Sequence, residues 1–222
     1  MSVRPRTRLA VFDCDGTLAD GQAAISRSME RAFASCGLAC PPRHEVLRIV
    51  GLSLPVAIRR LVPDAGEVAH GALVVAYKEA FFQARTSGEH SEPLFDGIDA
   101  LVRSLHGAGC TLGIATGKSD RGLKGLLAAH GLADFFATLQ TADRHPSKPH
   151  PAMLEAALAE AGAAPGEAVM IGDTTYDIEM ARAAGVRALG VAWGYHGAKE
   201  LLDAGADAVA ATAAELEKLI HG

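Results

Sequence analysis

The chain has 222 residues, 49% of them hydrophobic and 21% charged, so it can bury a sizeable core and is not a disordered chain. Its formal net charge is −5 and only 5% of its residues are aromatic. These values argue against a nucleic-acid-binding surface, which is basic and uses aromatic side chains for stacking. No apolar run approaches the roughly 20 residues of a membrane-spanning helix. The apolar stretch from Leu9 to Phe12 is also too short for a signal peptide. We therefore expect a cytoplasmic protein with no nucleic-acid or membrane partner.

The first predicted element is a short strand over residues 7–12, which stops abruptly at Asp13. From about residue 21 to residue 89 the apolar residues recur at helical spacing, with prolines and glycines between the helices. No strand is predicted in that stretch.

After Pro93 the predicted helices and strands alternate. The predicted strands cover residues 110–115, 135–139, 168–171 and 186–191, and the predicted helices cover residues 98–105, 119–130, 150–161 and 175–184. A last short strand and helix are expected within residues 207–221. This alternation predicts parallel strands with right-handed crossovers. We expect an α/β fold, a doubly wound parallel sheet formed by residues 1–19 and 91–222, with a helical domain inserted at residues 20–90.

Four polar clusters lie at or near the ends of these strands, at residues 13–17, 116–119, 147–149 and 172–177. Three of them directly follow a strand, and the cluster around Lys148 lies on a loop. Ligands of open α/β sheets bind at the carboxyl ends of the strands. The four clusters should therefore converge on one site.

The expected site is acidic. Asp13, Asp173 and Asp177 would bring two or three carboxylates together, and their mutual repulsion needs a compensating charge. Mg²⁺ prefers oxygen ligands and is commonly held by one or two carboxylates together with phosphate oxygens. The cluster therefore predicts a magnesium site.

The same edge also offers groups for binding and cleaving a phosphate ester. Thr116, the Gly117 amide and Lys148 supply donors and positive charge for a phosphoryl group. Asp13, at the strand tip, suits the nucleophile that forms an aspartyl-phosphate. Asp15, two residues further on, can protonate the leaving alcohol and later deprotonate water.

Some of these residues also have simpler interpretations. Asp173 can cap the helix that follows it, and Asp177 lies in the first turn of that helix, where an acid favours the helix dipole. Ser119 is expected to cap a helix and nothing more. Lys118 is expected to lie in solvent.

The motifs DCDGTL, ATGKS, KPHP and GDTTYD resemble, in order and spacing, the four signature motifs of the haloacid dehalogenase superfamily. The helical insert resembles the α-helical cap of that superfamily, and the chain is most similar to its phosphoglycolate phosphatase-like branch. The resemblance covers the whole chain. It implies an Mg²⁺-dependent phosphatase that hydrolyses a small phosphorylated metabolite such as phosphoglycolate through an aspartyl-phosphate. The sequence leaves open whether the protein is a monomer or a homodimer.

The resemblance also implies a role for each residue of the site. The catalytic residues are Asp13, Asp15, Thr116 and Lys148. The substrate-binding residues are Thr17, Gly117 and Lys148. The metal ligands are Asp13, the carbonyl of Asp15, and Asp173, with Asp177 in a supporting position.

Two departures from the superfamily patterns narrow the chemistry. True dehalogenases lack an acid at the place of Asp15, so Asp15 favours a phosphate ester. The sugar-phosphate mutases carry an arginine in the cap loop where this chain has Leu54, which argues against a mutase and favours a small or less charged substrate.

The sequence leaves alternative functions open. A pyrophosphatase or another phosphorus-bond hydrolase would use the same groups. A phosphonate hydrolase would need a cap lysine, and the only one in the insert is Lys78, well along a helix. A receiver domain of a signalling protein also accepts a phosphoryl group on an aspartate at the edge of a parallel sheet, but it lacks a cap and an acid at the place of Asp15.

Overall fold

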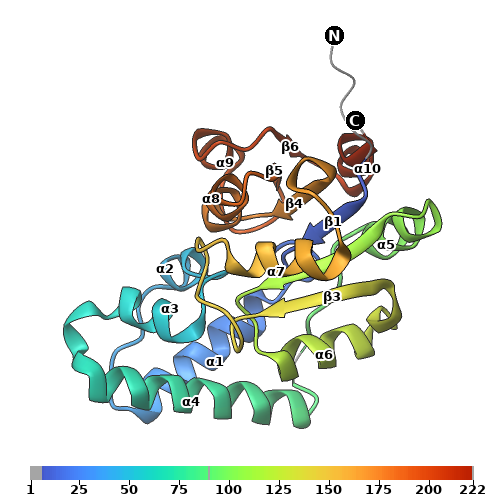
Figure 1. The fold of residues 1–222 in the computed structure, drawn as a ribbon. Coiled ribbons are helices and arrows are strands. Elements are labelled where there is room, and N and C mark those ends of the chain that lie inside the picture. Colours follow the sequence, from blue (N-terminus) through green and yellow to red (C-terminus); the bar gives the residue numbers. More distant parts are fainter. Residues whose placement is uncertain (1–6, 90, 222) are drawn as a thin grey trace.

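The computed structural model describes residues 7–89 and 91–221, which form a parallel sheet covered by helices, with a helical cap beside it (Figure 1). In these residues the sheet has six strands in the order β3-β2-β1-β4-β5-β6. The strands are β1 (Leu9–Phe12), β2 (Thr111–Thr116), β3 (Phe136–Thr141), β4 (Ala168–Gly172), β5 (Arg187–Val191) and β6 (Ala208–Ala210). The predicted doubly wound parallel sheet is confirmed.

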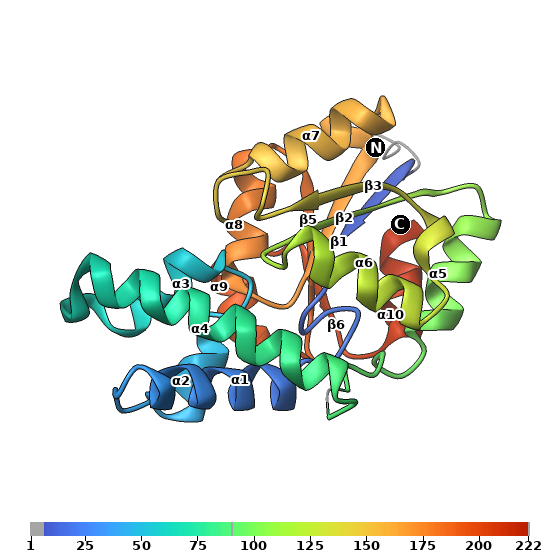
Figure 2. The same ribbon diagram turned by 90° about the horizontal axis from the view of Figure 1, so that it is seen from below.

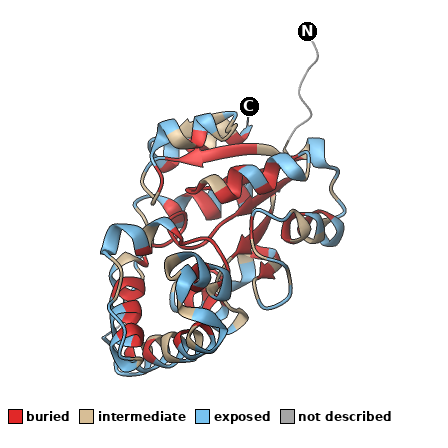
Figure 3. Ribbon diagram, turned by 90° about the vertical axis from the view of Figure 1, so that its left-hand side faces the viewer, coloured by how far each residue is buried: buried red, intermediate tan, exposed pale blue. Residues whose placement is uncertain are grey.

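Helices cover both faces of the sheet, because successive side chains of a strand point to opposite faces. In β1, Ala10 and Phe12 belong to the hydrophobic cluster on one face, and Leu9 and Val11 belong to the cluster on the other. The first face is covered by α5 (Ile98–Gly107), α6 (Asp120–Ala129) and α10 (Ala213–His221). The second face is covered by α7 (Ala152–Ala161), α8 (Thr175–Ala183) and α9 (Ala198–Asp203). The central strands are accordingly buried almost throughout, whereas the edge strands β3 and β6 are only partly buried (Figure 3).

Two elements differ from the sequence-based expectation. The six-residue helix α9 was not predicted, because only one of its residues, Leu201, is buried and it has no apolar periodicity. Strand β3 runs to Thr141, two residues beyond the predicted end. Its last residues are polar but buried, and their side chains are satisfied by hydrogen bonds from Gln140 Nε2 to Thr138 Oγ1 (2.7 Å) and from Thr141 Oγ1 to Asp120 Oδ1 (2.8 Å).

The cap consists of α1 (Gln22–Ser35), α2 (Arg43–Arg48), α3 (Leu54–Leu61) and α4 (Gly66–Thr86). It has its own hydrophobic cluster, which includes Met29, Phe33, Ile58 and Leu73. In Figure 2 the cap lies to one side of the sheet, with α4 running close to α6 of the core. The predicted boundary at residue 90 lies outside the described residues, as do residues 1–6 and 222 of the predicted core.

Short 3₁₀ turns complete the described structure at η1 (Pro63–Ala65), η2 (Ala133–Phe135) and η3 (Pro165–Glu167). Among the described helices, none combines the length and the apolar character needed to cross a bilayer.

Candidate active site

The centre of the site is a group of carboxylates at the ends of two adjacent strands. Strands β1 and β4 pair in parallel, with Phe12 opposite Ile171, so the residues that follow them leave the sheet side by side. The Asp13 amide continues the ladder by donating to the Ile171 carbonyl at 2.8 Å. As predicted, Asp13 and Asp173 lie together. With Asp177 they form a buried group whose ligand atoms are all within 4.8 Å of one another.

The turn after Asp13 passes very close to Asp173. Gly16 has a φ of +86°, and a Cβ there would lie 2.2 Å from Asp173 Oδ2. A side chain at this position would therefore suffer both an unfavourable backbone conformation and a collision with the site. This is the physical reason for glycine in the first motif.

The Asp173 carboxylate is held by two donors. Thr17 Oγ1 donates to Asp173 Oδ1 at 2.7 Å, and the Tyr195 amide donates to Asp173 Oδ2 at 2.9 Å. Burial raises the pKa of Asp173 well above its usual range, and the nearby charges of Asp13 and Asp177 raise it further. The Thr17 hydroxyl is thus directed at Asp173, and substrate binding by Thr17 stays a prediction.

Lys148 provides the buried positive charge of the site. Its Nζ lies 2.9 Å from Asp13 Oδ1 and 2.6 Å from Asp177 Oδ1, and its side chain has no exposed area. Asp177 Oδ2 accepts hydrogen bonds from the Thr174 amide at 3.1 Å and the Thr174 hydroxyl at 2.7 Å. Asp177 therefore contacts both the start of α8 and Lys148, and its supporting role in the site stays a prediction. The N-cap residue of α8 is Thr174 and not Asp173.

The buried charges of the cluster do not balance. Three carboxylates lie together and one ammonium group pairs with two of them, and burial raises the pKa of Asp13 to about 7 even though the Lys148 charge opposes the rise. Asp13 Oδ1 lies 2.9 Å from Lys148 Nζ, whereas Oδ2 has no side-chain partner among the described residues. Buried charged oxygens of this kind are strongly unfavourable without a partner. The donor set, all hard oxygen, fits a divalent cation such as Mg²⁺.

The second half of the site follows β2. Thr116 ends that strand and is buried, and its Oγ1 accepts a hydrogen bond from the Lys118 amide at 3.2 Å. Gly117 is where the cap approaches the core, since a Cβ there would lie 2.5 Å from the Leu52 carbonyl oxygen. Ser119 caps α6 by accepting from the Gly122 amide, as predicted.

The expectation that Lys118 lies in solvent is wrong. Its Nζ lies 2.8 Å from Asp15 Oδ1 and 2.7 Å from Glu92 Oε1, and the exposed fractions of the three side chains are 7%, 12% and 7%. Burial raises the pKa of Asp15, and the Lys118 charge opposes the rise. Glu92 was not predicted to belong to the site because it lies in no motif, in the segment that joins the cap to α5. The Asp15 carboxylate is thus held in a fixed position.

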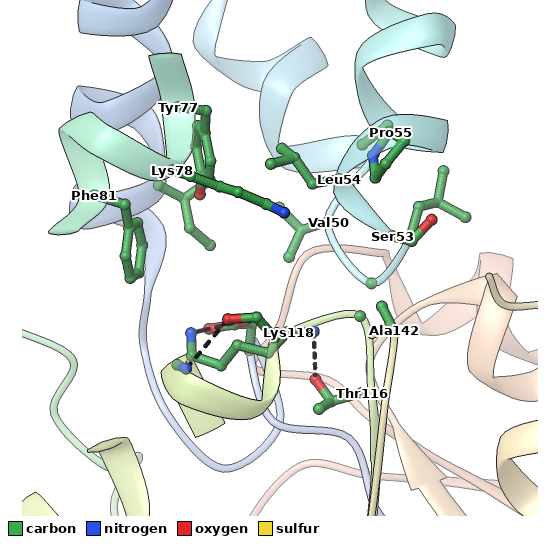
Figure 4. A pocket seen from close by; sticks show the side chains of 18 of the residues that line it. Val50, Ser53, Leu54, Pro55, Tyr77, Lys78, Phe81, Thr116, Lys118 and Ala142 are labelled. Atoms are coloured by element: carbon green, nitrogen blue, oxygen red, sulfur yellow. Dashed lines mark hydrogen bonds and ion pairs between the residues drawn. The ribbon is translucent and has the colours of Figure 1, made fainter. Parts of the chain in front are cut away.

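A cavity of about 420 Å³ lies between the cap and these residues (Figure 4). It is lined by Asp13, Asp15 and Thr116 from the core, and by the cap loop that carries Leu54. This loop also reaches the segment around Lys148, because the Ser53 amide donates to the Ser147 hydroxyl at 2.8 Å. The cap therefore closes directly over the strand ends.

Comparison with known proteins was made against this geometry. Residues 10–191 match the sequence profile of a family described as haloacid dehalogenase-like hydrolase. The chain belongs to this family.

Its relatives include several phosphatases. The chain is 32% identical to the probable phosphatase IndB of Dickeya dadantii (strain 3937), over 96% of this chain and 93% of that protein. It is 31% identical to the phosphoglycolate phosphatase of Yersinia pseudotuberculosis, over 94% of this chain and 91% of that protein. A solved structure described as a predicted phosphatase from Clostridium acetobutylicum aligns with a TM-score of 0.87 and 26% identity, over 97% and 99% of the two chains. The identification as a haloacid dehalogenase-like phosphatase, similar to the phosphoglycolate phosphatase branch, is confirmed.

Proposed function

We propose that this protein is an Mg²⁺-dependent phosphomonoesterase that hydrolyses a small phosphorylated metabolite through an aspartyl-phosphate on Asp13. The observation that carries the proposal is the position of Asp13. Its carboxylate is buried at a strand end beside Asp173, with Lys148 2.9 Å from Oδ1 and no side-chain partner for Oδ2 among the described residues. A buried carboxylate with one free oxygen at the end of a ligand cavity is suited to react with a bound group.

The metal would be held by Asp13, the Asp15 carbonyl and Asp173. When bound, Mg²⁺ supplies positive charge that offsets the negative charge of the phosphoryl oxygens and of the carboxylates. Asp177 has both carboxylate oxygens engaged, one by Lys148 and one by Thr174. We therefore assign Asp177 to orienting Lys148 and not to direct ligation.

The reaction itself uses the side chains of the chain in two steps. In the first, an Asp13 oxygen attacks phosphorus and the ester oxygen leaves with a proton from Asp15, which gives the free alcohol and an aspartyl-phosphate. In the second, Asp15 takes a proton from water, the water oxygen attacks the same phosphorus, and inorganic phosphate and free Asp13 result. Thr116, the Gly117 amide and Lys148 bind the phosphoryl oxygens in both steps.

Two neighbours position the acid. Lys118 holds the Asp15 carboxylate by a buried ion pair, and Glu92 holds Lys118 by a second one, so Asp15 is kept in one orientation for proton transfer. The closed cap limits access of water to the cavity, which favours transfer to Asp13 over direct hydrolysis.

The proposal is tested by measuring phosphate released from 2-phosphoglycolate and 4-nitrophenyl phosphate. We expect turnover with Mg²⁺, loss of turnover with a chelator, and recovery when Mg²⁺ is restored. Asp13→Asn should abolish turnover, whereas Asp134→Asn, a change at an exposed aspartate, should not affect it. Acid quenching of a reaction with ³²P-labelled substrate should trap a phosphoprotein with the wild type and none with Asp13→Asn. Full turnover by Asp13→Asn would refute the proposal. Preferential release of phosphate from pyrophosphate, or a phosphoprotein that persists without turnover, would favour the alternative hydrolase or the receiver domain.

A further inference from the structure

The cavity that reaches Asp13 extends well beyond the room that a phosphoryl group needs. Its volume of about 420 Å³ is far more than the roughly 10–15 Å³ that a cavity needs, by the same measure, to hold one water molecule. It is also within the range of roughly 300–1,000 Å³ that is typical of sites for larger organic ligands. A two-carbon alcohol such as glycolate would leave much of this space to water.

The walls contributed by the cap are largely apolar. They come from α1, from the loop before α3 and the start of α3, and from α4, and they include Ile25, Met29, Val50, Leu54, Tyr77 and Phe81. The rings of Tyr77 and Phe81 lie 5.8 Å apart with their planes tilted by 31°. Figure 4 shows these rings on one side of the cavity and Val50 and Leu54 on the other. Water against such walls is easily displaced by an apolar group, so the walls favour a flat, apolar body in the leaving group.

One cation crosses this apolar space. Figure 4 shows the Lys78 side chain extending from α4 between the two walls, with its ammonium group over the cavity. Among the described residues Lys78 has no ion-pair partner, and the other cations of the cavity lining either form ion pairs or pack against other side chains or helices. Lys118 is in the buried ion pairs described above, Arg121 lies 4.4 Å from the centre of the Phe82 ring, and the Arg85 guanidinium packs against α6. Lys78 is therefore available to a ligand.

Resting on the proposed function, we propose that the substrate is the phosphate ester of a flat, apolar alcohol that carries an anionic group, and that Lys78 binds this anion. The phosphoryl group lies at the acidic end, the body lies between the Tyr77 and Leu54 walls, and the anion meets the Lys78 ammonium. Such a substrate shares a carboxylate with phosphoglycolate but has a larger, apolar body. Lys78 is thereby a specificity-determining residue, and it takes no part in bond cleavage.

Three phosphate esters test the preference for an apolar body and the preference for an anionic group separately. They are 4-carboxyphenyl phosphate, its neutral and nearly isosteric analogue 4-carbamoylphenyl phosphate, and 2-phosphoglycolate. For the wild type with Mg²⁺ we expect kcat/KM to be highest for the carboxyphenyl ester, at least ten-fold above the carbamoyl ester. A charge-assisted hydrogen bond accounts for a difference of about ten-fold or more. Lys78→Met should remove most of that difference by raising KM for the carboxyphenyl ester. Its kcat/KM for the carbamoyl ester should stay within about two-fold of the wild-type value. Lys78→Arg should restore part of the difference, and Lys124→Met, at an exposed lysine of α6, should leave it unchanged.

Two results would overturn the inference. A higher kcat/KM for 2-phosphoglycolate than for both aryl esters would contradict the apolar body. An unchanged ratio of the two aryl esters in Lys78→Met would contradict the role of Lys78.

A binding measurement tests this inference independently of the proposed function. The non-hydrolysable 4-carboxybenzylphosphonate and 4-carbamoylbenzylphosphonate can be compared by calorimetry, which requires no turnover. At least ten-fold tighter binding of the carboxylate, lost in Lys78→Met, supports the Lys78 site even if no ester is hydrolysed. Equal binding of the two phosphonates by the wild type overturns it.

Discussion

The strongest stability prediction concerns Lys148, the only buried cation in contact with Asp13 and Asp177 among the described residues. Its ammonium group lies 2.9 Å from one carboxylate and 2.6 Å from the other, and all three side chains are almost wholly inaccessible to solvent. Lys148→Met keeps an unbranched apolar stem of similar length and removes the charge together with its hydrogen bond to Asp177. The two carboxylates then remain buried with no compensating cation.

The expected loss of stability follows from that burial. Removing one partner of a buried ion pair costs about 3–5 kcal/mol because the other charge is left uncompensated. For a chain of this size, about 2–4 °C of melting temperature corresponds to 1 kcal/mol. In a chelating buffer Lys148→Met should therefore melt about 6–20 °C below the wild type. Lys124→Met, at an exposed lysine, should change stability by no more than about 0.5 kcal/mol.

The loss should also depend on pH. Burial raises the pKa of Asp13 to about 7, so between about pH 4 and pH 7 the folded state binds a proton that the unfolded state has released. Stability of the metal-free protein therefore falls as the pH rises through this window. Without the Lys148 charge the folded-state pKa rises further, so the deficit of the variant should be largest at pH 8 and smaller at pH 5.

Thermal melts followed by circular dichroism at pH 5 and pH 8, in chelator, measure both effects. If the variant fails to fold at pH 8, its melt at pH 5 still gives the comparison with the wild type. Melting of Lys148→Met within 2 °C of the wild type at both pH values would show that these carboxylates do not need the lysine charge.

Three further predictions concern the metal, the acid and the turn. Mg²⁺ at a hundred times its dissociation constant should raise stability by about 2.7 kcal/mol, and Asp173→Asn should reduce this gain, as measured by melts with and without the ion. Lys118→Met should slow hydrolysis of 2-phosphoglycolate about 10–100-fold but that of 4-nitrophenyl phosphate much less, because a nitrophenolate leaves without a proton. Glu92→Gln should act in the same direction. Equal slowing of both esters would contradict a role of these residues in positioning the acid. Gly16→Ala should lose more stability in denaturant melts than Gly37→Ala, since both have positive φ but only at Gly16 does a Cβ collide with the site.

The sequence alone determined the sheet and most of the central site. Each parallel strand is a short apolar run followed at once by polar residues, and this is local information. Because the carboxyl ends of parallel strands meet at one edge, the positions of Asp13, Thr116 and Asp173 follow from the strand pattern. Lys148 was identified from its motif although it lies on a loop, and the structure places it against Asp13.

The tertiary structure alone decided what surrounds that centre. Lys118 and Asp15 are 103 residues apart, and Glu92 is 26 residues from Lys118, yet their side chains form one buried group. Asp15 and Lys118 lie in motifs that were expected to converge, but the side-chain pattern did not predict their ion pair, and no motif contains Glu92, whose contact depends on how the segment after the cap returns to the sheet. The same is true of Lys78, whose place over the cavity depends on the packing of α4 above the strand ends. Strand pattern is set by neighbours in sequence, whereas burial of a charge and the shape of a cavity are set by contacts between distant segments.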